Sequence, residues 1–260
     1  MKRLSLLMLA LAGATSAAAE DLRIGTSADY PPWESVDTEN EIIGFDRDFG
    51  DELCKRIGAE CSWVNQAYDG LLPGLQVGKF DAVISGISIN EERAKMVDFT
   101  VAYADAPSAF AGPAASELTP ELTKDQLVAG LSGKTIGVQT GTTFEQVLRA
   151  HLPDVTVRTY DRPEQIVDDI SAERIDAGLM ELAAWQPFVS GESKDELKFF
   201  GPPLTGADYP EFGEGQGVAL KKGNAELQKR MDEAITAMLS DGTLEAISTK
   251  WFGYDLSVKR

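Results

Sequence analysis

The chain has 260 residues, of which 42 are acidic and 24 are basic, so its formal net charge is −18. A surface this acidic repels phosphate groups, and we therefore exclude nucleic acids and anionic membranes as partners. With one histidine, His151, and two cysteines, the sequence lacks the side chains of an ordinary zinc or iron site, so we expect no metal and no cofactor.

The N-terminus has the features of a secretory signal. Lys2 and Arg3 precede the apolar run 4–12, and three alanines at 17–19 form a small-residue cleavage site. We therefore assign 1–19 to a signal peptide and expect a periplasmic protein without a lipid anchor. The remaining stretch of about 241 residues suits one large domain or two lobes. In an oxidising compartment, Cys54 and Cys61 can close a short disulfide loop.

The first part of the exported chain alternates between strand and helix patterns. Strands are predicted at 22–26, 41–45, 61–64 and 82–84, and helices at 46–57, at 71–77 and from Glu91. We expect Asp46 to cap the first helix, and residues 27–34, with two prolines, to form a loop. This β-α-β-α-β order predicts a parallel, doubly wound sheet.

Small polar residues follow the predicted strand 82–84. Ser85, Gly86 and Ser88 stand just past its carboxyl end, where ligands bind in open α/β sheets. Ser85 and Ser88 offer hydroxyl groups, and Gly86 lets a ligand approach the backbone closely. This turn is therefore our first candidate for a ligand site.

The helix after this turn carries an arginine in its first turn. Asn90 is predicted to cap the helix, which places Arg93 near the serines. A planar guanidinium beside hydroxyl groups is a common receptor for a carboxylate. The alternative is a surface helix in which Arg93 pairs with Glu91 or Glu92.

The pattern restarts in the second half of the chain. Strands are predicted at 135–138, 155–160, 175–180 and 217–220, and helices at 126–131, 144–151, 163–172, 225–239 and 243–251. A polar loop, 139–143, ends one of these strands at a helix N-terminus, which suits an anion, and Glu181 stands just past another strand. We expect the strand-end loops of both units to converge on one interlobe cleft.

Several motifs, taken in order, resemble the periplasmic amino-acid-binding proteins of polar amino-acid ABC transporters. They are Ile24-Gly25-Thr26…Tyr30-Pro31-Pro32-Trp33-Glu34, Gly44-Phe45-Asp46-Arg47-Asp48, Phe80 to Arg93, Asp98-Phe99-Thr100, Gly141-Thr142-Thr143, Arg174-Ile175-Asp176-Ala177, Asp241-Gly242-Thr243 and Lys250-Trp251-Phe252-Gly253. The resemblance covers essentially the whole exported chain.

The resemblance implies an α/β fold of the type II periplasmic-binding-protein kind. Each of two lobes would hold a doubly wound, mainly parallel sheet. Lobe 1 would comprise 20–106 and 214–260, and lobe 2 would comprise 107–213. Two crossings, near 105–108 and 202–214, would act as a hinge that shuts around the ligand.

The same resemblance implies which residues hold the ligand's α-carboxylate. Arg93 would bind it in a bidentate contact, helped by Ser88 and by the N–H and hydroxyl groups of Thr143. Thr142 lies beside Thr143 and belongs to the same set. No residue is assigned a catalytic role.

The remaining ligand contacts are implied in the same way. Ser85 and the backbone carbonyl of Ser85 or Gly86 would receive the α-ammonium, with Glu181 as its counter-charge. Tyr30 and Tyr68 would sandwich the ligand's side chain. The spacing of Cys54 and Cys61 resembles the disulfide of lysine/arginine/ornithine-, histidine- and opine-type binding proteins.

Three positions depart from the family pattern. Gly86 replaces a serine of some relatives, and Glu181 stands where binders of basic amino acids commonly have aspartate. Ser27 stands where those binders place an acid that holds a cationic side chain, which weakens a lysine or arginine assignment. We therefore expect a polar amino acid, then a basic one, then an opine-like derivative.

The implied function is capture of an amino acid and its delivery to an ABC-transporter permease by a monomeric binding protein. The alternative is a secreted dehydratase of the cyclohexadienyl dehydratase type, which looks similar through the Ser-Gly-Ile-Ser block. Such enzymes place a catalytic glutamate three residues after the carboxylate that is here Glu181. This sequence has Ala184 there, so it lacks the general acid that the elimination needs.

Overall fold

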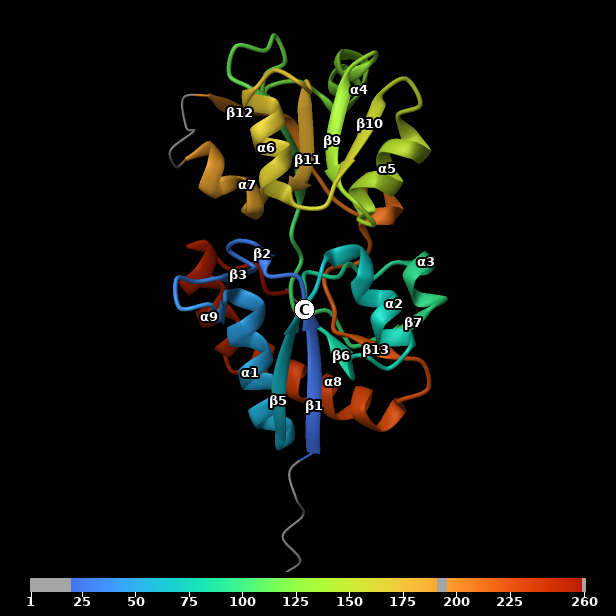
Figure 1. The fold of residues 1–260 in the computed structure, drawn as a ribbon, viewed down its shortest axis with the longest axis vertical. Coiled ribbons are helices and arrows are strands. Elements are labelled where there is room, and N and C mark those ends of the chain that lie inside the picture. The colour runs from blue at the N-terminus through green and yellow to red at the C-terminus, as the bar shows by residue number, and fades with distance from the viewer. Residues whose placement is uncertain (1–19, 191–195, 259–260) are drawn as a thin grey trace, which may run out of the picture.

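The computed structural model describes residues 20–190 and 196–258, so the predicted signal peptide, 1–19, lies outside the described residues. Figure 1 shows two lobes, one above the other, joined by thin extended segments. Each lobe is built on a five-stranded sheet with helices on both faces. The predicted α/β fold with two lobes is confirmed.

The lower lobe contains both ends of the described chain. Its sheet has the order β5-β1-β6-β13-β7, with β1 (Glu20–Thr26), β5 (Ala59–Asn65), β6 (Ala82–Val83), β7 (Val97–Phe99) and β13 (Ala219–Lys221). Its helices are α1 (Phe45–Ile57), η1 (Tyr68–Gly70), α2 (Leu71–Gln76), α3 (Glu91–Ala94), α8 (Ala225–Ser240) and α9 (Thr243–Phe252). β1 is parallel to β5 and β6, whereas β13 is antiparallel to its neighbours because it returns from the other lobe.

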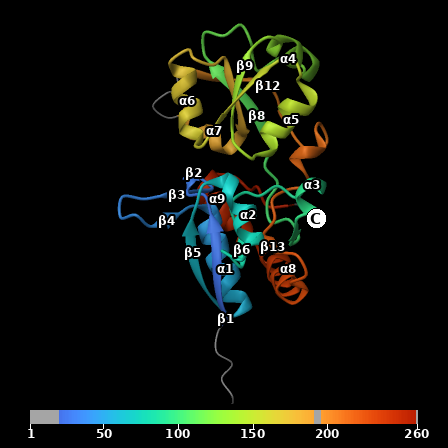
Figure 2. The same cartoon turned by 45° about the vertical axis from the view of Figure 1, so that its right-hand side comes forward.

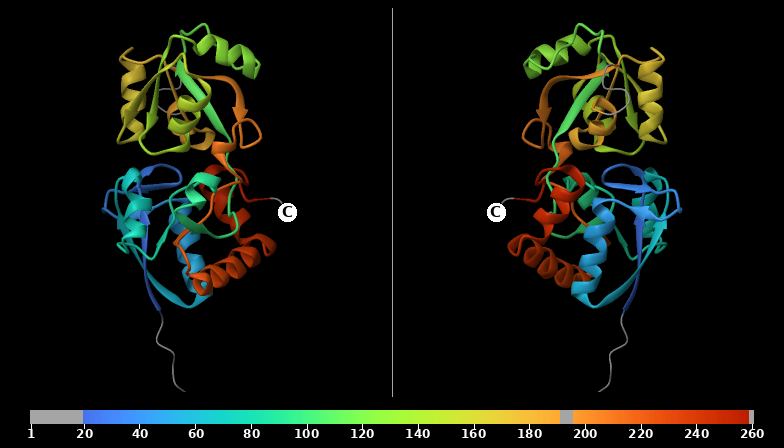
Figure 3. Two further views of the ribbon diagram at one scale, coloured as in Figure 1. Left: turned by 90° about the vertical axis from the view of Figure 1, so that its right-hand side faces the viewer. Right: turned by 90° about the vertical axis from the view of Figure 1, so that its left-hand side faces the viewer.

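Helices cover the central part of this sheet on both faces. On one face, Phe45 and Phe49 of α1 pack with Met231 of α8. On the other face, Leu71 and Leu75 of α2 form a second core. A sheet that is covered on both sides needs strands without a polar face, which explains the short apolar runs in the sequence. Figure 3 shows α8 and α9 packed on the lower lobe.

The upper lobe repeats this plan. Its sheet has the order β10-β9-β11-β8-β12, with β8 (Ser108–Pro113), β9 (Thr135–Gln139), β10 (Thr156–Tyr160), β11 (Ala177–Glu181) and β12 (Leu197–Leu204). Its helices are α4 (Lys124–Leu131), α5 (Thr143–His151), α6 (Pro163–Ser171), α7 (Leu182–Val189) and η2 (Pro210–Phe212). β9, β10 and β11 are parallel, whereas β8 is antiparallel to β11 and β12. No helix among the described residues has the length and apolar character to cross a membrane.

Two extended segments connect the lobes and run side by side. Gln216 N–H donates to the Ala104 carbonyl at 2.7 Å, and Tyr103 N–H donates to the Gln216 carbonyl at 2.9 Å. These antiparallel bonds tie the outgoing segment to the returning one. The two crossings that the hinge requires are therefore present.

Two local predictions were wrong. Asp46 does not cap α1, because the helix begins after Gly44 and Asp46 lies inside its first turn, fully buried. Gly44 has φ +135, and a Cβ there would lie 2.2 Å from the Trp33 carbonyl oxygen, so only glycine fits. Residues 27–34 are also not simply a loop, because they contribute to a small antiparallel sheet.

This small sheet consists of β2 (Asp29–Tyr30), β3 (Glu34–Val36) and β4 (Ile42–Ile43). Figure 2 shows its β3–β4 end projecting from the lower lobe. β2 pairs only Asp29 and Tyr30 with β3. A two-residue strand is too short to produce a readable alternation, which is why the sequence pattern missed it.

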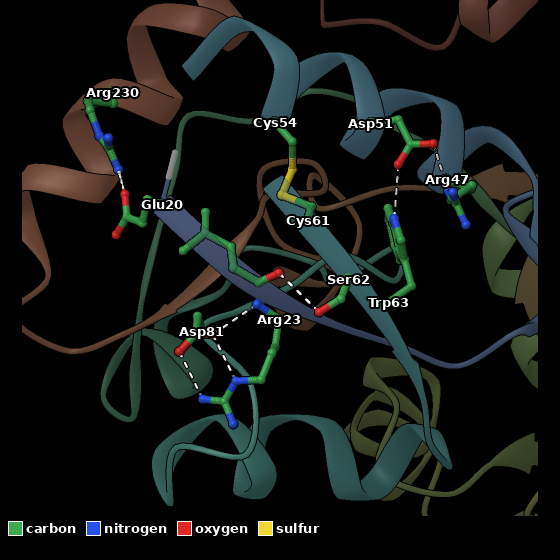
Figure 4. The surroundings of a disulfide bond; sticks show 11 residues. Glu20, Arg23, Arg47, Asp51, Cys54, Cys61, Ser62, Trp63, Asp81 and Arg230 are labelled. Atoms are coloured by element: carbon green, nitrogen blue, oxygen red, sulfur yellow. Dashed lines mark hydrogen bonds and ion pairs between the residues drawn. A yellow bond between two sulfur atoms is a disulfide. The ribbon is translucent and has the colours of Figure 1, made fainter. Parts of the chain in front are cut away.

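The predicted disulfide is present and joins α1 to β5. Figure 4 shows Cys54, near the end of α1, bonded to Cys61 of β5. Close by, Trp63 Nε1 donates to Asp51 at 3.0 Å, and Arg47 forms an ion pair with the same aspartate at 2.7 Å. These contacts hold the first helix against the edge strand of the lower sheet.

Removing the disulfide should destabilise the lower lobe. We expect the double variant Cys54→Ala/Cys61→Ala to lose about 2 to 3 kcal/mol of unfolding free energy, because the bridge closes a loop of sequence separation 7 in the unfolded chain. Urea unfolding measures this loss. Wild-type protein treated with a reducing agent is the control and should shift equally, whereas an unchanged midpoint in both samples would contradict the prediction.

Candidate functional site

The residues predicted for the site come from both lobes and lie where the lobes meet. The lower lobe contributes Tyr30, Tyr68, Ser85, Gly86, Ser88 and Arg93, and the upper lobe contributes Thr142, Thr143 and Glu181. Hydrogen bonds between the lobes join Tyr30 to Glu181, and Arg93 to the carbonyl of Gly141, the residue before Thr142. The structure therefore brings these distant segments together.

Arg93 is buried, with 3% of its surface exposed. The Asn90 side chain caps α3 by accepting the Arg93 N–H at 2.9 Å, as predicted. The guanidinium donates to the Ser88 carbonyl at 3.2 Å and to the Tyr68 hydroxyl at 3.1 Å. It also donates to the Gly141 carbonyl of the upper lobe at 3.4 Å.

None of these partners carries a negative charge. Among the described residues, no carboxylate lies within 4.0 Å of Arg93, and Glu91 and Glu92 are exposed. The alternative in which Arg93 pairs with one of them is therefore not the arrangement found. A buried guanidinium without a counter-charge is costly unless an anion joins it, so this group is well suited to bind a carboxylate.

Glu181 is the matching buried acid of the upper lobe. It stands at the end of β11 and is 6% exposed. Its carboxylate contacts the Tyr30 hydroxyl, and its N–H donates to the same hydroxyl at 3.1 Å. Burial raises the pKa of Glu181 to about 7, partly offset by the Tyr30 hydrogen bond. A cationic ligand group beside it would stabilise the ionised form and lower this pKa.

The turn after β6 is held from below. Ser85 is buried, and its hydroxyl accepts the Ser27 N–H at 3.0 Å and donates to Glu34 at 2.5 Å. The Gly86 N–H donates to Asp46 at 2.6 Å, and its φ of +55 suits glycine. The Ser85 hydroxyl and the Gly86 N–H both donate within the protein. These two residues therefore have only hydrogen-bond acceptors left for a ligand.

Thr142 and Thr143 stand at the N-terminus of α5. The Thr142 hydroxyl donates to the Gln139 carbonyl at 2.7 Å and does not cap the helix. The Gly141 carbonyl receives Arg93, so this helix end lies directly against the guanidinium. A positive helix end and a guanidinium from opposite lobes together favour an anion.

A pocket of about 560 Å³ is lined by Asp29 and Pro31, the chain neighbours of Tyr30, and none of the nine predicted ligand contacts lines it. It is lined by Ser27, Ala28, Asp29, Pro31, Ser35, Val36, Asn40, Asn65, Gln66, Ala67, Asp161, Arg162 and Glu164. Arg162 of the upper lobe lies 3.9 Å from Asp29 of the lower lobe. Burial raises the pKa of Asp29, whose carboxylate accepts the Ser27 hydroxyl at 3.0 Å.

A usable signal for this pocket was present in the sequence. Asn65 ends β5, and Asp161 directly follows β10, so both stand at carboxyl ends of parallel strands. Ligands bind at the carboxyl ends of strands in open α/β sheets, so the same pattern also predicts ligand contacts at Asn65 and Asp161. Within the described residues, no group of three or more acidic, histidine or cysteine side chains could hold a metal ion.

Comparisons with known proteins agree with this architecture. A family model for bacterial extracellular solute-binding proteins, family 3, matches residues 22–254. The histidine-binding periplasmic protein of Salmonella typhimurium is 36% identical over 265 residues, which cover 98% of this chain and 99% of that protein. The ABC transporter arginine-binding protein 1 of Escherichia coli is 36% identical, over 97% of this chain and 99% of that protein.

A solved structure supports the same relationship. It is an ancestral arginine-binding protein bound to arginine. The superposition covers 90% of this chain and 98% of the ancestral chain, with a TM-score of 0.80 and a sequence identity of 32%. The match extends through both lobes and the crossings between them. The chain therefore belongs to the bacterial extracellular solute-binding proteins of family 3.

Proposed function

We propose that this protein captures a polar α-amino acid between its lobes and delivers it to the membrane permease of an ABC transporter. The observation that carries the proposal is a pair of unmatched buried charges. Among the described residues, Arg93 forms no ion pair with a carboxylate and Glu181 forms none with a basic group. An α-amino acid supplies a carboxylate for the first and an ammonium for the second.

Relatives support this class of ligand and its location. They include proteins named as histidine-binding, arginine-binding and periplasmic, and one is named as part of an ABC transporter. We place the protein in the periplasm for this reason and because of its predicted signal peptide. The nine predicted site residues are proposed as its ligand contacts.

The division into lobes gives the mechanism of capture. We propose lobe 1 as 20–106 with 214–260, and lobe 2 as 107–213, since this division assigns each five-stranded sheet to one lobe. Arg93 and Glu181 then stand on opposite lobes, so a ligand that binds both favours the closed form. The two crossings, which leave lobe 1 just after Ala104 and return to it just before Gln216, would absorb the motion.

The pocket beside Tyr30 indicates where the ligand's side chain extends. Its walls combine the acids Asp29 and Glu164 with the amides of Asn65 and Gln66. Such walls suit a polar or cationic chain, and about 560 Å³ leaves room for an opine-like extension. Asp29, held by Ser27, would supply the negative charge that position 27 itself lacks.

We propose that the protein is not an enzyme. The position three residues after Glu181 is Ala184, which is 1% exposed and has no ionisable group. The dehydratase alternative needs a general acid there. Turnover of prephenate would contradict this part of the proposal.

A ligand panel tests the proposed function. Mature protein, unfolded to strip bound ligand and then refolded, would be heated with each of the twenty amino acids, ornithine, citrulline, octopine, nopaline, ectoine and prephenate. We expect one α-amino acid at 100 times its Kd to add about 2.7 kcal/mol of stability, seen as a higher Tm. A response to ectoine alone, which has no free α-ammonium, would contradict the roles of Arg93 and Glu181. A response to prephenate alone would favour the enzyme.

A further inference from the structure

Two buried acids beneath the ligand site are not explained by the contacts described above. Glu34 of β3 is 1% exposed and Asp46 of α1 is fully buried. Their carboxyl groups interact with each other, and both contact the turn that carries Ser85 and Gly86. One carboxyl of such a pair must carry a proton.

The contacts show which of the two carries the negative charge. Asp46 Oδ2 accepts the Gly86 N–H at 2.6 Å, and Asp46 Oδ1 accepts the Tyr103 hydroxyl at 3.0 Å. Both oxygens therefore have a donor from another residue. Donors of this kind stabilise an ionised carboxylate, so Asp46 is the charged member of the pair.

Glu34 has the opposite pattern. Its Oε1 accepts the Ser85 hydroxyl at 2.5 Å, but its buried Oε2 receives no N–H or O–H donor from any described residue. A buried carboxylate oxygen without a donor is strongly unfavourable. The cost disappears if Oε2 carries a proton and donates it to Asp46.

The charges around the pair agree with this assignment. Glu34 interacts electrostatically with Asp46 and Asp29, and the charge of Glu34 also acts on Tyr68. Within the described part of the chain, neither acid of the pair forms an ion pair with a basic side chain. Burial and the charge of Asp46 raise the pKa of Glu34 well above its usual range.

The wider surroundings add two cations, Arg93 and Arg162, and two further acidic groups, Glu181 and Tyr103. Arg93 and Glu181 interact electrostatically, and Glu181 also feels the charge of Asp46. Tyr103 is buried, and burial together with Asp46 raises its pKa well above the usual value, so it stays a donor. Arg162 of the upper lobe lies 3.9 Å from Asp29.

The proton on Glu34 determines what the turn presents to a ligand. The Ser85 hydroxyl donates to Glu34 and accepts the Ser27 N–H, so one lone pair remains. The Gly86 N–H is taken by Asp46. Ser85 and Gly86 thus offer a ligand acceptors and no donors, which matches an ammonium.

We propose that Glu34 is a positioning residue that acts as a neutral acid, sharing one proton with Asp46 and so holding Ser85 and Gly86 ready for an ammonium group. The inference rests on the proposed function. It adds that the turn with Ser85 and Gly86 keeps its position only while Glu34 holds its proton. Glu34 does not touch the ligand. If the proton leaves, two negative carboxylates in contact repel each other, the turn is displaced and ligand affinity falls.

The first test needs no ligand. The variant Glu34→Gln keeps an acceptor for Ser85 and a donor for Asp46, but it cannot ionise. At pH 7 wild-type protein also contains protonated Glu181, since the pKa of that group is about 7, so the band is read from a difference spectrum. We expect the infrared spectrum of wild type minus that of Glu34→Gln to show the C=O stretching band of one protonated carboxyl group. Glu39→Gln, an exposed change in the same hairpin, is the control and should show no such difference from wild type. Absence of the band from the Glu34→Gln difference spectrum would overturn the inference.

The second test measures binding of L-arginine by calorimetry from pH 6 to 9. Wild-type affinity should fall by up to about tenfold per pH unit once the proton is lost. Glu34→Gln should keep the neutral-pH affinity and retain only the pH dependence that Glu181 and the α-amino group of arginine contribute, which wild type shares. Glu34→Ala should bind about tenfold or more weakly throughout. Identical profiles in wild type and Glu34→Gln would overturn the inference.

The two tests separate the possible failures. If wild-type protein does not bind L-arginine but the infrared result holds, the proton on Glu34 stands and the proposed ligand is wrong. If L-arginine binds but the band is unchanged in Glu34→Gln, the proposed function stands and the role of Glu34 is wrong. Because Glu34→Gln conserves size and hydrogen bonds, the inference remains testable if Glu34→Ala does not fold.

Discussion

We expect the replacement of Arg93 with alanine to weaken the binding of any α-amino acid severely. Arg93 is the one basic side chain among the nine predicted ligand contacts, and the present partners of its buried guanidinium are neutral oxygens. Losing one partner of a buried charge pair costs about 2 to 5 kcal/mol, so we expect the Kd to rise by roughly thirtyfold to several thousandfold. Isothermal titration calorimetry with the amino acid found in the panel measures this change.

Two further variants make this result specific. Arg93→Lys keeps the charge but loses the planar fork, and we expect an intermediate affinity. Arg149→Ala removes an exposed arginine of α5, 58% exposed in its side chain, and should leave binding unchanged. Urea unfolding without ligand verifies that Arg93→Ala is folded. Wild-type affinity in a folded Arg93→Ala would refute the proposed carboxylate contact.

Replacing Glu181 with glutamine should weaken binding and stabilise the ligand-free protein. Burial raises the pKa of Glu181 to about 7 in the folded protein, well above the ordinary value of about 4.5. Between these values the folded state holds a proton that the unfolded state has lost. The unfolding free energy of wild type therefore falls as pH rises through this window, by about 3 kcal/mol in total. Glutamine does not titrate and should remove this part of the decline.

The measurement is urea unfolding without ligand from pH 4.5 to 8.5, compared between wild type and variant. The unfolding free energies of the two proteins should differ little near pH 4.5. Above pH 7 the difference should reach its maximum, with Glu181→Gln the more stable protein. Calorimetry at pH 7.5 should show a loss of affinity in the same variant. Glu233→Gln, 69% exposed in its side chain, is the control and should match wild type in both. Parallel stability curves for wild type and Glu181→Gln would disprove the buried-acid assignment.

The local features of the fold followed from the sequence. The alternation of strand and helix patterns predicted the parallel pairing of β1 with β5 and β6, and the second unit with its own sheet. Asn90 was correctly predicted as a cap, because capping depends on residues three positions apart. The disulfide joins residues seven apart, again a local relationship.

Predictions failed where a residue's environment is set by distant parts of the chain. Aspartate is a common helix-capping residue. Gly44, however, must pass close to Trp33, so the helix begins earlier and Asp46 lies inside it, beneath Gly86. β12 was not predicted, because residues 197–204 contain two prolines and a glycine and its pairing with β8 is irregular. Propensity is a weak guide when tertiary packing determines the backbone path.

The sequence by itself determined the order of strands and helices, the strand-end position of each polar loop, and the family to which the chain belongs. The element order and the loop positions follow from short-range periodicity, which is visible in any stretch of ten residues, whereas the family was indicated by the resemblance of short motifs. Only the tertiary structure decided that Tyr30 meets Glu181, 151 residues away, and that Arg162 closes a pocket opposite Asp29. It also decided that Glu34 and Asp46 lie in contact. The reason is physical: such contacts depend on how two sheets and their helices pack, and burial, which sets the pKa of each acid, exists only after that packing is complete.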